Sequence, residues 1–145
     1  MQQHYSIIVG SVLGASEYVA DALADTINAS GGNAKIHLDP VLEDIDPQST
    51  WIICTSTHGA GELPDNIQPF ADALATADLS SVNAYVVGLG DSSYDTFCHG
   101  AITMESLLLE RGATLLAPPC HIDVLHHPIP EDEAVAWFKQ QVAAD

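Results

Sequence analysis

Short hydrophobic runs alternate with segments of helical periodicity along this chain, and this alternation constrains the fold more than any other feature. The runs are compact and rich in β-branched residues, and they predict strands at 5–9, 34–38, 51–55, 84–89 and 114–117. Apolar residues at three- and four-residue spacing predict helices from Ser16 to the Gly31-Gly32 pair, over 67–77, up to Arg111, and from Pro130 onward. Residues 41–49, with three acids and a proline, predict a loop.

Strict alternation of strand and helix predicts an α/β fold, in which a parallel sheet is covered by helices on both faces. Right-handed crossovers leave few topologies for five strands, and the order 2-1-3-4-5 is one of them. Pro118-Pro119 interrupts the continuation of the fifth strand. The 145 residues are expected to form a single domain, 1–145. Ligands of such folds bind at the carboxyl ends of the strands, so the loops after the first, third and fourth strands are the candidate site.

The charge of the chain excludes several classes of partner. The sequence contains 3 Lys and Arg residues and 20 Asp and Glu residues, which gives a formal charge of −17. Phosphate backbones and anionic membrane surfaces are bound by clustered basic side chains, so neither nucleic acid nor a membrane is an expected partner. The three cysteines lack close spacing and are expected to be reduced thiols, and residues 7–15 lack the basic region of a signal peptide. A cytoplasmic location is therefore expected.

The first loop has the composition of an anion site at a helix N-terminus, where unpaired amides favour phosphate. It consists of Gly10, Ser11, Val12, Leu13, Gly14, Ala15, Ser16 and Glu17. Neither the Walker pattern nor GxGxxG is present, and the alternative is a tight turn with Ser16 as the N-cap. Because the loop contains no cation, a phosphate there would be an anchor held by neutral donors and not a group for transfer.

The second and third loops offer small residues around a few rings. In the second loop, 55–66, His58 lies among glycines, and the alternative is a solvated turn with His58 on the surface. In the third loop, 88–98, glycines precede Tyr94, a ring suited to stacking on a flat ligand. The alternative there is that Tyr94 and Phe97 are the first core-facing residues of the next helix.

Together these loops resemble the FMN-binding loops of the flavodoxin-like family, and the third is similar to those of sulfite reductase and cytochrome P450 reductase flavodoxin domains. The run STHGAGELPDN and the Ile-Pro-Glu-Asp start of the last helix resemble the short MioC-type flavodoxins. The resemblance covers essentially the whole chain. It implies a flavodoxin-like three-layer sandwich and FMN as the cofactor.

The resemblance also implies the cofactor-binding residues, and it implies neither catalytic residues nor metal ligands. His58 and Tyr94 would lie on opposite faces of the isoalloxazine ring. The family often has Thr in place of Leu13 and Asn or Thr in place of Ala15, so phosphate binding would rely on Ser11, Ser16 and main-chain amides. The full implied set is Ser11, Val12, Leu13, Gly14, Ala15, Ser16, Thr57, His58, Gly59, Ala60, Gly61, Leu89, Gly90, Asp91, Tyr94, Phe97 and Cys98.

The function implied by the resemblance is that of an electron carrier and not an enzyme. Single electrons would pass from a flavodoxin/ferredoxin NADP reductase to an iron–sulfur or radical enzyme, which for MioC-type members is biotin synthase. The chain is too short to add an NADPH-binding domain. The acidic charge predicts partners with basic surfaces, met by salt-sensitive attraction, and a monomer or weak dimer is expected.

Other interpretations remain open at this point. The departures at Leu13 and Ala15 leave room for a flavodoxin-fold binding or regulatory module with weak FMN binding or none. A receiver-type signalling domain would need acids after the first strand and a Lys after the fifth, which this sequence lacks. The residues His121, Asp123, His126 and His127 give a weak metal-site pattern, for which loop histidines are the alternative. The scarcity of Lys and Arg is also compatible with a salty or cold habitat.

Overall fold

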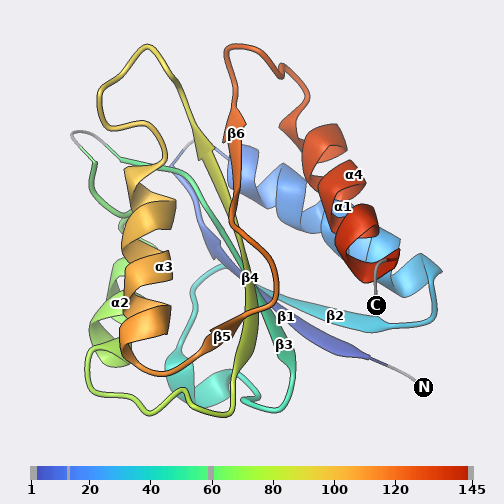
Figure 1. Ribbon diagram of the computed structural model, residues 1–145, viewed down its shortest axis with the longest axis vertical. Coiled ribbons are helices and arrows are strands. Elements are labelled where there is room, and N and C mark those ends of the chain that lie inside the picture. The colour runs from blue at the N-terminus through green and yellow to red at the C-terminus, as the bar shows by residue number, and fades with distance from the viewer. Residues whose placement is uncertain (1–2, 13, 59–60, 144–145) are drawn as a thin grey trace.

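The computed structural model describes residues 3–12, 14–58 and 61–143, and in it a parallel sheet lies between two layers of helices (Figure 1). Strands and helices alternate as the sequence predicts. The elements are β1 His4–Gly10, α1 Ala15–Ala29, β2 Asn33–His37, a 3-10 helix Leu42–Asp44, β3 Thr50–Thr55, α2 Gln68–Leu74, β4 Asn83–Gly90, α3 His99–Glu110, β5 Thr114–Leu115, β6 Cys120–Asp123 and α4 Pro130–Ala143.

The sheet has the order β2-β1-β3-β4-β5, which confirms the predicted order 2-1-3-4-5. Its fifth position is divided in two. β5 pairs with the start of β4, with Thr114 opposite Asn83, and β6 pairs with its end, with Asp123 opposite Gly90. Pro118-Pro119 lies between the two pieces, where proline has no N–H for the ladder. The predicted interruption of the fifth strand is therefore confirmed.

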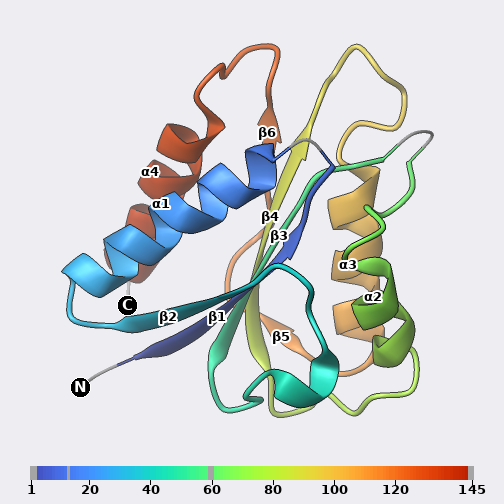
Figure 2. The same cartoon turned by 180° about the vertical axis from the view of Figure 1, so that it is seen from behind.

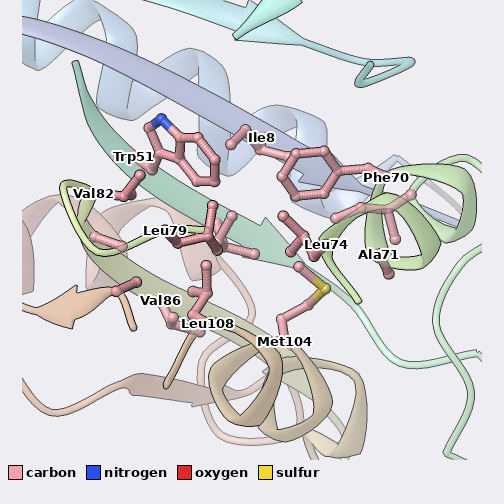
Figure 3. Packing of buried hydrophobic residues seen from close by; sticks show 14 of the residues in the cluster. Ile8, Trp51, Phe70, Ala71, Leu74, Leu79, Val82, Val86, Met104 and Leu108 are labelled. Atoms are coloured by element: carbon pink, nitrogen blue, oxygen red, sulfur yellow. The ribbon is translucent and has the colours of Figure 1, made fainter. Parts of the chain in front are cut away.

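Helices α1 and α4 cover one face of the sheet, and α2 and α3 cover the other (Figure 2). Successive residues of β3 point to opposite faces. Trp51 and Ile53 join the core beneath α2 and α3, where Trp51 packs against Phe70 at 5.8 Å between ring centroids (Figure 3). Ile52 and Cys54 join the core beneath α1 and α4. The continuous apolarity of this strand thus follows from burial on both faces.

The helix ends follow the sequence signals closely, with small differences. Gly31 has φ +92°, and the N–H of Gly32 donates to the carbonyl of Ile27 at 3.0 Å, so the predicted left-handed closure of α1 is confirmed. The predicted loop at 41–49 contains a short 3-10 helix, closed by a hydrogen bond from Asp44 N–H to the carbonyl of Val41. Helix α2 is shorter than the predicted 67–77.

Within the described ranges, no helix combines the length and apolarity needed to cross a membrane.

Candidate functional site

A cleft of about 450 Å³ opens at the carboxyl ends of the strands, within the usual size range of small-molecule sites. Its walls come from the three predicted loops and from the segment after β6. The lining residues are Val12, Ala15, Ser56, Thr57, His58, Leu89, Gly90, Asp91, Tyr94, Thr96, Phe97, Cys98 and Val124. The topology therefore gathers distant parts of the sequence around one cavity.

Most of the residues implied by the resemblance lie on this wall. They are Val12, Ala15, Thr57, His58, Leu89, Gly90, Asp91, Tyr94, Phe97 and Cys98. Four others, Ser11, Gly14, Ser16 and Gly61, belong to the same loops but not to the described lining. Leu13, Gly59 and Ala60 lie outside the described residues. Sequence reasoning missed Ser56, Thr96 and Val124.

The first loop leads into α1 through a compact turn. The Gly14 N–H donates to Ser11 Oγ at 2.9 Å, and the Gly14 carbonyl accepts from the Glu17 N–H at 3.0 Å. The cap position belongs to Gly14, with φ +94°, and α1 begins at Ala15. The interpretation of Ser16 as the N-cap is therefore wrong, because the helix begins one residue before Ser16.

Ser16 instead lies in the first turn of α1. Its side chain is fully buried, and its Oγ has no hydrogen-bond partner among the residues that the structure describes. A buried hydroxyl without a partner costs free energy, so a ligand oxygen within its reach would be stabilised. This position, at the N-terminal end of a 15-residue helix, favours an anion.

The second loop holds His58 in a tight turn. The His58 N–H donates to the Glu62 carbonyl at 2.7 Å, and the Glu62 N–H donates back to the His58 carbonyl at 2.8 Å. His58 is half-buried and lines the cleft, which argues against a solvated turn with this side chain on the surface. Thr57 Oγ1 accepts from the Gly100 N–H at 3.0 Å and so ties the loop to the first turn of α3.

The third loop presents Tyr94 at the mouth of the cleft. Asp91 Oδ1 accepts from the backbone N–H of Ser93 at 2.9 Å and from its hydroxyl, and the Tyr94 N–H donates to the Asp91 carbonyl at 3.1 Å. These bonds form a local turn. Tyr94 is 66% exposed and α3 begins only at His99, so the interpretation of Tyr94 as a core-facing helix residue is wrong.

The inner part of the third loop is packed tightly. Phe97 is half-buried, and its ring meets His121 edge to face, with 6.3 Å between centroids. A Cβ on Gly90 would lie 2.7 Å from the backbone N of Cys98, so this close approach requires glycine. Burial raises the pKa of the Cys98 thiol to about 12, with a smaller contribution from the Asp123 carboxylate. Cys98 is therefore a neutral thiol in the wall of the cleft.

The segment after β6 supplies a fourth wall that loop composition did not indicate. The Val124 N–H donates to the Gly90 carbonyl at 2.9 Å, and Asp123 Oδ1 accepts from the N–H groups of Ser92 and Leu125 at 3.2 and 3.0 Å. The hydrogen bonds from Ser92 lower the pKa of the Asp123 carboxyl. The interrupted fifth strand was the sequence signal that could have indicated this wall, because the carboxyl end of that strand reaches the same edge of the sheet as the three loops.

The histidines of this segment make separate pairs. His126 Nε2 lies 3.5 Å from Asp123 Oδ2, and His127 Nδ1 lies 3.3 Å from Glu133 Oε1. Within the ranges that the structure describes, no group of three or more His, Cys, Asp or Glu side chains is placed to hold a metal ion. These contacts give the histidines a role in local loop structure.

The described wall of the cleft contains no Lys or Arg side chain. Lys35 lies on β2 and Lys139 on α4, while Arg111 follows α3 and donates from Nε to the Ala77 carbonyl at 2.8 Å. An anion in this cleft would be held by amides, hydroxyls and the α1 dipole.

The donors and rings fit the two ends of FMN. The buried Ser16 hydroxyl and the start of α1 suit its phosphate, and Tyr94 and His58 suit a flat ring system.

Comparisons with known proteins agree with this geometry. The family model described as flavodoxin matches residues 7–138. The protein MioC homolog of Haemophilus influenzae is 43% identical over 137 residues, covering 93% of this chain and 94% of that protein. Protein MioC of Escherichia coli K12 is 40% identical over 135 residues, covering 92% of each. In a solved structure, a cysteine-to-serine variant of the flavodoxin from Pseudomonas aeruginosa superposes with a TM-score of 0.89 at 32% identity, covering 98% of each chain.

Family match, relatives and fold therefore agree with the family resemblance of the sequence. The parallel sheet order and the cleft at its carboxyl edge are those expected for a flavin site in this fold. The chain belongs to the flavodoxin family, whose cofactor is FMN.

Proposed function

We propose that this flavodoxin carries single electrons from a flavodoxin/ferredoxin NADP reductase to an acceptor enzyme, with FMN held in the cleft. The observation that carries the proposal is the meeting of the three loops around one cleft whose rim residue, Tyr94, is 66% exposed. A ring stacked on an exposed side chain lies near the molecular surface, where a partner protein can approach it. The relative named flavodoxin YqcA, 35% identical over 138 residues, supports an electron carrier.

Each part of the wall has a distinct task in this proposal. The amides at the start of α1 and the Ser16 hydroxyl would hold the phosphate, and His58 and Tyr94, which both line the cleft, would orient the ring. Bound FMN supplies the chemistry of accepting and releasing electrons, and the protein tunes it through contacts and charge. The neutral Cys98 thiol provides apolar packing and no redox group of its own.

The partners follow from the surface charge and from the family. A formal charge of −17 favours a reductase and an acceptor with basic surfaces near their redox centres, and disfavours nucleic acid and membranes. We propose biotin synthase, or another iron–sulfur or radical enzyme, as the acceptor. A cytoplasmic location, a single domain spanning 1–145, and a monomeric or weakly dimeric state complete the proposal.

Reconstitution tests the proposal directly. The apoprotein is titrated with FMN, then reduced with NADPH and a flavodoxin/ferredoxin NADP reductase, and the reduced protein is mixed with biotin synthase. We expect stoichiometric FMN binding, reduction that requires the reductase, and reoxidation by the acceptor. Both rates should fall by about tenfold or more between low and high ionic strength, because screening removes the electrostatic steering.

The outcomes separate the rival interpretations. A purified protein that binds FMN weakly or not at all would favour a binding or regulatory module. A protein that binds FMN tightly but exchanges electrons with neither partner would contradict the proposed carrier role. If the rates of reduction and reoxidation did not depend on ionic strength, the acidic surface would reflect an adaptation to habitat and not partner recognition.

A further inference from the structure

Asn66, at the end of the second loop, joins three segments that are distant in sequence. Its Nδ2 donates to the carbonyl of Val9 at 2.7 Å and to the carbonyl of Leu38 at 2.8 Å. Its Oδ1 accepts from the backbone N–H of Ser11 at 2.9 Å. One carboxamide therefore connects the end of β1, the residue after β2 and the first loop.

This contact lies where the sheet ladder ends. The β1–β2 pairing stops with Ile8 opposite His37, whereas β1 continues beside β3 to Gly10. Val9 and Leu38 follow directly after that last β1–β2 pair, and Asn66 donates to both of their carbonyls. Two carbonyl acceptors and one N–H donor require a side chain that donates twice and accepts once, which is the chemistry of a carboxamide.

A chain of hydrogen bonds runs from Asn66 to the start of α1. Asn66 holds the N–H of Ser11, Ser11 Oγ accepts from Gly14, and the Gly14 carbonyl accepts from the Glu17 N–H in the first turn. The direction in which the first loop leaves β1 therefore depends on a residue 55 positions away. Asn66 is not among the described residues that line the cleft.

We propose that Asn66 is a positioning residue that holds the first loop in the conformation that binds the cofactor's phosphate. The inference rests on the proposed function only in placing FMN in the cleft, with its phosphate at the start of α1. The loop has no cation and lacks donors at Leu13 and Ala15, so its amides must be aimed correctly to bind an anion. Asn66 directs these amides through the Ser11 N–H, because the amide nitrogen and oxygen of its own side chain already pair with backbone groups.

Two flavins distinguish positioning from general structural damage. Apoprotein of the wild type and of Asn66→Ala is titrated with FMN and with riboflavin, which lacks the phosphate. We expect the Kd for FMN to rise by about tenfold or more in the variant, and the Kd for riboflavin to stay within about twofold. The titration involves no redox partner, so its result does not depend on whether the chain carries electrons.

Asn28→Ala is the matched control. Asn28 Oδ1 accepts from the Ala34 N–H at 3.2 Å, a similar side-chain contact between the end of α1 and β2. This variant should leave both flavin affinities unchanged. The inference is overturned if Asn66→Ala binds FMN as tightly as the wild type does, or if it loses both flavins equally. A wild type that binds no FMN would overturn the proposed function and this inference together.

A measurement on the wild type covers the case in which Asn66→Ala fails to fold. Amide hydrogen exchange of Ser11 is recorded by NMR in the apoprotein. We expect this amide to be protected before any FMN is added, because Asn66 already binds it. Exchange of Ser11 as fast as that of the same residue in an unstructured peptide would overturn the inference.

Discussion

The first-loop side and the third-loop side of the cleft are built in different ways. On the first-loop side, Ala15 offers no polar side chain, the Ser11 hydroxyl already accepts from Gly14, and the Ser16 hydroxyl is buried without a partner among the described residues. On the third-loop side, Tyr94 and Phe97 face the cleft directly. One side offers mainly backbone groups, and the other offers rings.

This difference shows which residues determine the affinity for the phosphate and which determine the affinity for the ring. A backbone site depends on loop conformation, which residues outside the cleft can control. A ring site depends on the side chains that touch the ligand and on the close packing that supports them. Changes on the third-loop side should therefore weaken FMN and riboflavin alike, whereas changes on the first-loop side should weaken FMN alone.

The largest effect is expected for Gly90→Val. The new Cβ would lie 2.7 Å from the backbone N of Cys98 and 3.0 Å from a ring carbon of Phe97, so the third loop must shift. We expect both flavins to lose affinity by about 100-fold, together with a loss of stability of about 1–3 kcal/mol. Isothermal titration and urea unfolding measure the two effects.

Gly31→Asn is the control for that variant. Gly31 has φ +92°, which Asn tolerates better than most residues, and a Cβ there meets nothing within 4 Å. Flavin affinity should be unchanged. If Gly90→Val retained riboflavin while losing FMN, the third loop would not be the ring side, and the comparison would fail.

A smaller effect is expected for Tyr94→Ala. Loss of the stacked ring should raise the Kd of FMN and of riboflavin by the same factor, about tenfold. Tyr18→Ala is a matched control, because Tyr18 is also 66% exposed but lies on α1 and does not belong to the described lining. Fluorescence quenching of each flavin gives the affinities. An effect on FMN alone would contradict the proposed stacking role.

Ser16→Ala probes the first-loop side and should have opposite effects on stability and on FMN binding. Removing a buried hydroxyl that has no partner in the described part of the chain should raise the free energy of unfolding of the apoprotein by about 1 kcal/mol. The Kd for FMN should rise by about fivefold while that for riboflavin stays constant. Ser6→Ala is the contrasting control, because the Ser6 hydroxyl is paired with Ser49 at 2.8 Å and its loss should destabilise the protein.

The architecture was largely predictable from local sequence. The alternation of strands and helices, the Gly31-Gly32 helix end and the interrupted fifth strand all follow from residues that are neighbours in the chain. The three loops were also predictable, because the carboxyl ends of parallel strands share one edge of the sheet. Helix starts were less so: α1 begins at Ala15 because Gly14, and not Ser16, takes the cap position.

The contacts that organise the loops were not predictable, because they join residues far apart in sequence. Asn66 reaches Ser11 across 55 residues, and Thr57 reaches Gly100 across 43. Each uses a single polar side chain, which leaves no periodic pattern. Val124 was missed for a different reason: the interrupted fifth strand indicated this edge of the sheet, but the place of Val124 depends on the register of β6 beside β4.

The carboxylates of Asp123 and Asp78 test whether the segment after β6 supports the third-loop side of the cleft. Both accept hydrogen bonds from a serine, but only Asp123 lies at the end of β6, where that segment begins. Hydrogen bonds from Ser92 lower the pKa of Asp123, and hydrogen bonds from Ser80 lower the pKa of Asp78. A lowered pKa in the folded state means that each ionised carboxylate stabilises the fold above the ordinary value of about 3.9. That contribution is lost as the pH falls from about 5 through the folded pKa.

Replacing either carboxylate by an amide should therefore have the smallest effect in this series. Asp123→Asn and Asp78→Asn should each lose less stability than the wild type does on acidification below about pH 5, measured by thermal unfolding at several pH values. Of these two carboxylates, only Asp123 binds the third loop, through the Ser92 N–H. Only Asp123→Asn should therefore weaken the binding of both flavins. The loss should be about twofold, because the amide oxygen of Asn still accepts this hydrogen bond. Equal flavin losses in the two variants would show that the segment after β6 contributes stability alone.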